Sequence, residues 1–251
     1  NIVQSNIVQS YISQSNIVQS YISQSNIVQS NIVQSNIVQS NNGLTIDDSA
    51  IVGCISRGDE DEYRVTVKDF VAWCERNHLQ LNVTKTKELV VDLRRDKVPV
   101  TPVSIRGVSV DTVEDYKYLG VYIDNKLDWA KNTDALYRKG QSRLYFLRRL
   151  RSFNICWTML RIFYESVVAS AILYAVACWG SRLRAADANR LNKLIRKAGD
   201  VVGVELDSLT AVSERRTLSK LQAIMDNGSH PLYDTVMRHR SSFSARLILL
   251  K

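Results

Sequence analysis

The sequence predicts an α+β protein in which a part built of strands and one helix precedes a part built only of helices. Three observations lead to this prediction. Residues 43–125 contain short segments with the period of two that is typical of strands, and residues 126–251 contain long segments with helical periodicity. Residues 1–42 hold a repeat of low complexity that follows neither period. We therefore divide the chain at residues 42 and 125.

The first 40 residues are eight five-residue units, six reading Asn-Ile-Val-Gln-Ser and two reading Tyr-Ile-Ser-Gln-Ser. Ordering a chain costs roughly 1–2 kcal/mol per residue for the backbone alone, so we expect a disordered repeat with a tendency to aggregate. The units faintly resemble pentapeptide-repeat proteins, but eight make only two coils of such a stack. The near identity of the units favours a translated tandem DNA repeat.

Near the start of residues 43–125 stand two adjacent carboxylates, Asp47 and Asp48. They lie at a predicted tight turn before a short apolar strand. Residues 60–77 carry apolar side chains at offsets of 4, 7, 8 and 11 from Tyr63, which is one face of a helix. This segment therefore predicts the single helix of the first part.

The rest of this part predicts strands. Residues 79–83 alternate as a strand does, residues 85–87 read as a turn, and residues 89–91 continue in β-favouring residues. Residues 98–110 contain two of the three prolines and predict a loop with a short hairpin. Residues 116–123 predict one further strand, rich in tyrosine.

After Leu127 the periodicity becomes helical. The predicted helices cover residues 129–151, 156–179, 185–197 and 213–225. The longest uncharged stretch outside the repeat, residues 166–181, is shorter than the ~20 residues that a membrane helix needs. We therefore expect a buried helix there and no membrane partner.

The charge of the chain is divided between its parts. Residues 41–125 hold 11 Lys and Arg against 15 Asp and Glu, whereas residues 126–251 hold 22 against 10. A basic field favours a polyanionic partner, so we expect sequence-independent binding of RNA or DNA. The four cysteines lack paired spacing, which indicates reduced thiols and an intracellular location, in the nucleus or cytoplasm.

The adjacent carboxylates Asp47 and Asp48 suggest a site for a divalent metal. Mg²⁺ prefers hard oxygen ligands and usually takes one or two carboxylates together with substrate phosphates. In phosphoryl transfer two such ions stabilise the attacking and leaving oxygens. Most Asp-Asp pairs in turns are merely solvated, but the apolar strand and helix that follow this pair favour a metal site.

Five blocks in this order form a recognisable series. They are Asp47–Gly53, Phe70–Cys74, Leu79–Glu88, Tyr116–Asp124 and Glu165–Gly180, followed by Ser229–Leu232 near the end. The series resembles the reverse transcriptases of LINE-type (non-LTR) retrotransposons. The resemblance implies a partial palm in residues 43–125 and a thumb in residues 126–251.

The same resemblance implies an RNA-directed DNA polymerase with Mg²⁺ as cofactor. Asp47 and Asp48 would hold the metal, Lys85 would approach the leaving pyrophosphate, and Tyr118 would lie in a strand pair that grips the primer end. For Lys85 a solvated turn residue is the alternative, and for Tyr118 core packing is the alternative.

The sequence departs from this family in two places. Thr45 and Ile46 stand where the family places an aromatic residue and usually alanine. The family also needs another aspartate from an upstream strand, together with the fingers, and residues 1–44 contain no charged residue. We therefore expect a degenerate fragment that is inactive alone, because a two-metal site without a principal carboxylate loses several kcal/mol of catalysis.

The best candidate for nucleic-acid binding is residues 138–151. Its basic residues are Arg138, Lys139, Arg143, Arg148, Arg149 and Arg151, interleaved with Tyr137, Tyr145 and Phe146. Residues 135–161 carry charges of one sign only, so such a helix can follow phosphates without reading sequence. The alternative is a solvated helix face.

Two other interpretations remain. Residues 111–150 resemble, over that stretch only, the AlkB-type tRNA hydroxylase–methyltransferase family, which leaves a non-catalytic module as an alternative. Iron dioxygenases need a His-x-Asp pair, and none of the three histidines is followed by Asp at that spacing. Cys74 and His78 have the spacing of half a metal site, but a buried cysteine beside a histidine at the helix end is the favoured interpretation.

Overall fold

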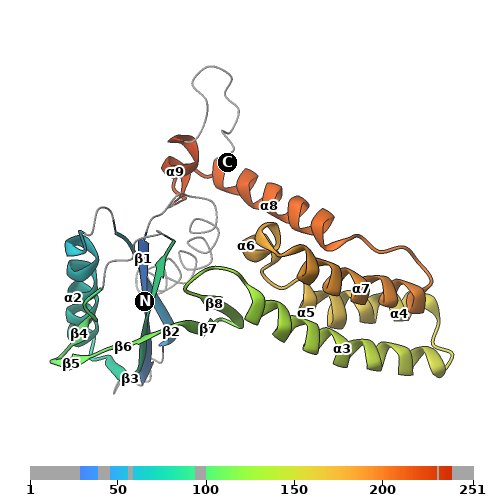
Figure 1. The fold of residues 1–251 in the computed structure, drawn as a ribbon, viewed down its shortest axis with the longest axis horizontal. Coiled ribbons are helices and arrows are strands. Elements are labelled where there is room, and N and C mark those ends of the chain that lie inside the picture. The colour runs from blue at the N-terminus through green and yellow to red at the C-terminus, as the bar shows by residue number, and fades with distance from the viewer. Residues whose placement is uncertain (1–28, 39–45, 56–58, 94–99, 231, 239–251) are drawn as a thin grey trace. The chain divides into compact units, whose positions relative to one another are not determined.

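The computed structural model describes residues 29–38, 46–55, 59–93, 100–230 and 232–238. They fall into two compact units, Asn1–Leu127 and Asp128–Lys251 (Figure 1). The first unit holds the strands and one helix, and the second holds helices. Each unit is described by itself.

The first unit contains a four-stranded sheet in the order β2-β1-β3-β6. Its strands are β1 (Gln29–Val38), β2 (Ile46–Cys54), β3 (Gln80–Asp92) and β6 (Asp111–Val113). β1 pairs antiparallel with both β2 and β3, and β6 runs parallel to β3. β1 therefore has a hydrogen-bonded neighbour on each side.

β1 consists of repeat residues, and this differs from the disorder expected for the repeat. The expectation considered the ordering cost of the repeat alone. In the sheet, the backbone groups of β1 are satisfied by two neighbouring strands, and its Ile and Val residues suit a pleated surface. Residues 1–28 and 39–42 of the repeat lie outside the described residues.

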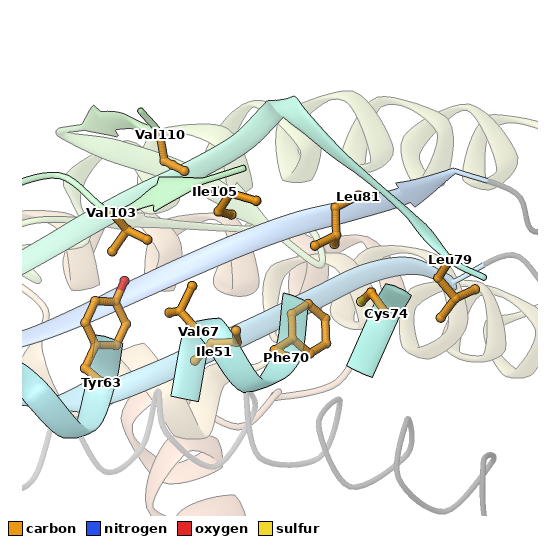
Figure 2. Close-up of a cluster of buried hydrophobic side chains, with 10 residues drawn as sticks. All are labelled: Ile51, Tyr63, Val67, Phe70, Cys74, Leu79, Leu81, Val103, Ile105 and Val110. Atoms are coloured by element: carbon orange, nitrogen blue, oxygen red, sulfur yellow. The ribbon is translucent and has the colours of Figure 1, made fainter. Parts of the chain in front are cut away.

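The predicted helix over residues 60–77 is confirmed as α2 (Asp61–Arg76). It buries Tyr63, Val67, Phe70 and Cys74 against the sheet, as the predicted apolar face requires. Figure 2 shows these four side chains facing residues of β2 and β3 and of the segment that follows β3. Burying side chains of this kind contributes about 1.5–3 kcal/mol each.

The end of α2 fixes how the chain enters β3. His78 has a φ of 56°, and the main-chain N–H groups of His78 and Leu79 donate to the oxygens of Glu75 and Cys74. This is the Schellman pattern that ends many helices. Cys74 is fully buried and His78 is exposed, so the interpretation as a buried cysteine beside a helix-end histidine is confirmed.

The predicted short hairpin within residues 98–110 is confirmed as β4 (Ser104–Ile105) and β5 (Val108–Ser109). Arg106 and Gly107 between them both have positive φ, as a type I′ turn requires.

The prediction of one strand over residues 116–123 is wrong. The structure has a hairpin there, β7 (Asp115–Tyr118) and β8 (Val121–Asp124), with Tyr118 paired to Val121. Leu119 and Gly120 form the turn with φ of 44° and 85°. Because aromatic residues occur throughout this segment, the sequence pattern did not reveal the turn.

The second unit is a bundle of helices (Figure 1). Its elements are α3 (Ala130–Ser152), α4 (Trp157–Phe163), η1 (Tyr164–Ala169), α5 (Ser170–Ile172), α6 (Val176–Trp179), η2 (Gly180–Arg182), α7 (Ala185–Val202), α8 (Leu209–Met225) and α9 (Tyr233–Arg238). The helices predicted at residues 129–151, 185–197 and 213–225 are confirmed as α3, α7 and α8. α7 continues five residues further than predicted, and α8 begins four residues earlier.

The prediction of one continuous helix over residues 156–179 is wrong. This segment contains a π-helical part, η1, and a break at residues 173–175, where Ala175 has a φ of 50°. Neither proline nor glycine marks the break. Side chains instead satisfy the freed main-chain oxygens: Arg216 donates to the oxygen of Leu173 over 2.7 Å, and Trp179 donates to that of Tyr174 over 2.9 Å.

Within the described part of the chain, no single helix has the length and apolar character of a membrane span, although residues 157–172 and 176–182 pass that test together across a 40° bend.

Glycines allow helices of this unit to approach closely. A Cβ atom on Gly140 of α3 would lie 2.9 Å from Cδ1 of Leu194 in α7. A Cβ atom on Gly180 would collide with the Ser213 hydroxyl of α8. At these two positions, side chains of the bundle therefore pack directly against the glycine backbone.

Candidate functional site

Asp47 and Asp48 lie within β2, so the predicted turn position is corrected. The register of the β1–β2 pair shifts between Ser35 and Ile37, and the two aspartates together oppose the single residue Asn36. This is a β-bulge, a feature that interrupts the ladder and re-aims side chains. The aspartate pair therefore occupies an irregular position of the sheet.

Lys85 lies in a second irregularity, on the other side of β1. Lys87 and Asn82 pair with Gln34 and Asn36 of β1, so the four residues 83–86 of β3 stand opposite the single residue Ser35. The side-chain oxygen of Asn82 accepts from the Lys85 N–H over 3.1 Å and from the Thr84 hydroxyl over 2.7 Å. The predicted turn at residues 85–87 is thus a bulge inside one continuous strand, and Lys85 is exposed on it.

The aspartate pair and the bulge that contains Lys85 stand beside neighbouring residues of β1. Asn36 of β1 is the shared reference point, because it opposes the aspartate pair on one side and pairs with Asn82 on the other. Neighbouring strands are about 4.8 Å apart, so the backbones of the aspartate pair and of Asn82 are separated by roughly 10 Å. A strand made of repeat residues lies between them.

Among the described residues, the neighbours of the aspartate pair in the sheet supply no further carboxylate. The neighbouring residues on β1 are Ser35 and Asn36, and the repeat that supplies this strand has no carboxylate. No described strand pairs with the outer edge of β2. Among the side chains that the structure describes, no group of three or more His, Cys, Asp and Glu could hold a metal ion.

Glu88 of β3 is a buried carboxyl that the sequence did not single out. It accepts a hydrogen bond from the Tyr63 hydroxyl of α2 over 3.0 Å and another from the Val103 N–H over 3.1 Å. Burial raises the pKa of Glu88 above its ordinary value. The residue joins α2, β3 and the segment before β4, which is a structural role.

Tyr118, a candidate primer contact, is buried with 5% of its surface exposed. Its side chain is not exposed, so the assignment to a nucleic-acid surface is corrected in favour of packing. Tyrosines on one face of a strand become buried when that face of the strand is covered.

The basic helix α3 separates its residues by face. It buries Leu136, Leu144 and Leu147 on one side. The exposed basic residues are Arg138, Lys139, Arg148, Arg149 and Arg151. Within the described residues, no ion pair is formed by any of these five, so their charge is directed at solvent.

Arg143 differs from the other basic residues of α3. It is half-buried, and its Nη1 donates to the main-chain oxygen of Val167 in η1 over 2.6 Å. This arginine serves the packing of the bundle, so its assignment to the nucleic-acid surface is corrected. In sequence it is indistinguishable from its neighbours.

The two halves of α3 differ in their surroundings. In the first half, Asp134 pairs with Arg190 of α7 over 2.7 Å, and the same guanidinium lies 4.5 Å from the centre of the Tyr137 ring. After Asp134, α3 contains no carboxylate. The uncompensated positive charge therefore lies on the part of the helix that follows Asp134.

Comparisons with known proteins give two matches. Residues 129–170, which hold α3, α4 and η1, match the family described as "Alkylated DNA repair protein alkB homolog 8, N-terminal". The chain is also 27% identical over 188 residues to "Probable RNA-directed DNA polymerase from transposon BS" of Drosophila melanogaster. A relationship with a transposon polymerase is supported.

The second match covers 74% of this chain and 19% of the relative, so the chain spans about a fifth of the length of that protein. No solved structure matches the chain.

Proposed function

We propose that the chain is a degenerate fragment of the RNA-directed DNA polymerase of a non-LTR retrotransposon, acting inside the cell, in the nucleus or cytoplasm. Residues 43–125 derive from the palm and residues 126–251 from the thumb. One observation carries the proposal: Asp47 and Asp48 on β2 and the bulge with Lys85 on β3 flank neighbouring residues of β1, in a single sheet that α2 covers. The similarity to a transposon polymerase supports it.

The fragment has no polymerase activity in this proposal. Asp47 and Asp48 would be the protein ligands of Mg²⁺, which neutralises developing charge on phosphates when bound. The strand beside them supplies only serine and asparagine at that level. Losing a carboxylate from a two-metal site removes several kcal/mol of transition-state stabilisation.

Primer extension by the whole chain, on RNA and DNA templates with Mg²⁺ or Mn²⁺, tests this part of the proposal. We expect no extension above background. Template-dependent synthesis that is lost in Asp47→Asn would contradict the proposed inactivity and would assign the aspartate pair a working metal site.

The remaining function is sequence-independent binding of RNA or DNA by the part of α3 that follows Asp134. Its exposed positive charge has no compensating carboxylate on the helix, and each phosphate that a basic side chain neutralises releases counterions. The slope of log affinity against log salt should become shallower by about 0.7–0.9 for each phosphate-binding side chain that is removed.

The test variant replaces four exposed basic residues of α3 by alanine: Arg138, Arg148, Arg149 and Arg151. Its control replaces four exposed basic residues of other helices: Lys193, Arg196, Lys197 and Lys220. We expect a flatter salt dependence for the α3 variant only. Equal effects of the two variants would mean that net charge, not this helix, governs binding.

The alternative is a non-catalytic module related to the AlkB-type tRNA family, and the match over residues 129–170 favours it. Both proposals use the same helices, but they predict different ligands. Competition between a folded tRNA and an unstructured RNA of equal length separates them. A strong preference for tRNA supports the module, and equal affinity supports the polymerase fragment.

A further inference from the structure

The second half of α3 and the residue after it expose large aromatic side chains. Tyr145, Phe146 and Phe153 have 62%, 53% and 62% of their surface exposed. Single exposed apolar residues are ordinary, but several on one stretch of helix indicate a binding surface. These three lie between arginines rather than among polar residues.

The aromatic residues share a face with basic residues. At about 100° per residue, Arg138, Tyr145 and Arg149 fall within roughly 40° of one another around the helix axis, and Phe146 and Phe153 follow within roughly 60° more. Leu136 and Leu147, which are buried, point the opposite way. The exposed face is therefore a stripe in which arginines and aromatic rings alternate.

The rings and the arginine are already in contact. Tyr145 and Phe146 meet edge to face with ring centres 5.6 Å apart, and the Arg149 guanidinium lies 5.2 Å from the centre of the Phe153 ring. Such contacts hold side chains in defined positions and reduce the entropy lost on binding. The stripe is to that extent preorganised.

The charge of this stripe selects its partner. Residues 135–161 contain basic residues and no carboxylate, so a polyanion is favoured over a neutral or acidic-and-basic protein surface. Duplex bases are stacked on each other, whereas unpaired bases offer their faces to aromatic rings. Aromatic rings beside arginines suit a strand whose bases are free.

We propose that Tyr145, Phe146, Arg149 and Phe153 form a stacking surface for the unpaired bases of single-stranded nucleic acid, flanked by Arg138 and Arg148 at its phosphates. This inference rests on the proposed nucleic-acid binding by α3 and gives it a substrate class. The arginines supply affinity for any nucleic acid, and the rings supply the preference for single strands.

The test uses the whole chain and two probes, an oligodeoxythymidylate of about 16 nucleotides and a mixed-sequence duplex of the same length. The variant Phe146→Leu/Phe153→Leu keeps apolar side chains of similar size but removes the rings. Phe146→Tyr/Phe153→Trp keeps the rings. Leu218→Ala, at a position 65% exposed on α8, is the control for loss of exposed apolar surface.

We expect the double leucine variant to lose at least about ten-fold in affinity for the single strand, since each stacked base contributes between about five-fold and one hundred-fold. Its duplex affinity and salt dependence should remain those of the original chain. The Tyr/Trp variant and Leu218→Ala should bind both probes normally. The substituted positions are all exposed, so thermal unfolding should be unchanged.

Three results would overturn the inference. If the leucine variant binds the single strand normally while the arginine variant of α3 does not, the stacking surface is wrong and the proposed nucleic-acid binding stands. If the leucine variant weakens both probes equally, the rings give no preference for single strands. If the original chain binds neither probe, the inference and the nucleic-acid binding on which it rests both fail.

Discussion

Nη1 of Arg143 donates a hydrogen bond over 2.6 Å to the main-chain oxygen of Val167, which joins α3 to the π-helical segment η1. This oxygen belongs to a part of the chain where the regular α-helical ladder is interrupted. An arginine from a neighbouring helix therefore gives this oxygen a side-chain donor and joins the two elements.

Arg143→Ala should lower the free energy of unfolding by about 1.5–3 kcal/mol, the usual contribution of a hydrogen bond from a charged donor. The salt dependence of nucleic-acid binding should not change. Urea unfolding and binding titrations measure the two effects. Arg148→Ala, on the exposed face of the same helix, should show the opposite pattern; loss of binding without loss of stability in Arg143→Ala would contradict the assignment.

Glu88 should make the stability of the first unit depend on pH. Burial raises the pKa of this carboxyl above its ordinary value of 4.5, so the folded state binds the proton more tightly than the unfolded state does. Stability is therefore largest below the ordinary pKa and falls as pH rises toward the raised pKa.

Glu88→Gln should remove this decline, because the amide carries no titrating proton and its oxygen can still accept from the Val103 N–H. Urea unfolding across about pH 4 to pH 8 checks it. Glu114→Gln, at an exposed position of the same unit, should leave the decline unchanged. If the free energy of unfolding of the original chain does not change with pH over this range, the predicted effect of Glu88 is wrong.

Gly203→Ala should destabilise the second unit through the backbone alone. Gly203 ends α7 with a φ of 85°, and a Cβ atom there would meet nothing within 4 Å. The left-handed conformation costs an L-residue roughly 1–2 kcal/mol. Chemical denaturation should show this loss, whereas Gly228→Ala, which is also sterically open but lacks a positive φ, should show none.

The cysteines should differ in reactivity. Burial raises the pKa of the Cys74 thiol to about 12 and that of the Cys178 thiol to about 11, whereas Cys156 is exposed. Among these three cysteines, alkylation near pH 8 followed by peptide mass spectrometry should label Cys156 first, and Cys74 and Cys178 only on unfolding. Rapid labelling of Cys178 in the native chain would mean that the core of the second unit opens readily.

The sequence pattern predicted the elements that depend on residues near one another in the chain. The apolar face of α2, the length of α3 and the turn at Arg106 and Gly107 all follow from residues near one another in the chain. The break at residues 173–175 could not be predicted, because Arg216 satisfies the freed oxygen of Leu173 from 43 residues away.

The candidate site shows the same division. The sequence marked Asp47, Asp48 and the exposed arginines of α3, but it could not show which arginine is used in packing or that Tyr118 is buried. Those outcomes depend on what lies opposite each residue in the folded chain. The placement of the aspartate pair and of the bulge with Lys85 on either side of one strand also depends on β1, and the repeat that forms β1 was expected to be disordered.

The composition of β1 has a consequence for inheritance. Residues 24–33 and residues 29–38 have the same ten-residue sequence. If replication slippage deletes the unit at residues 29–33, residues 24–28 take its place, with the same sequence at the same number of residues before β2. Duplication of that unit also leaves this sequence unchanged. The sequence of β1 is thus encoded more than once in the repeat. Alleles that differ by one such copy would encode the same sheet.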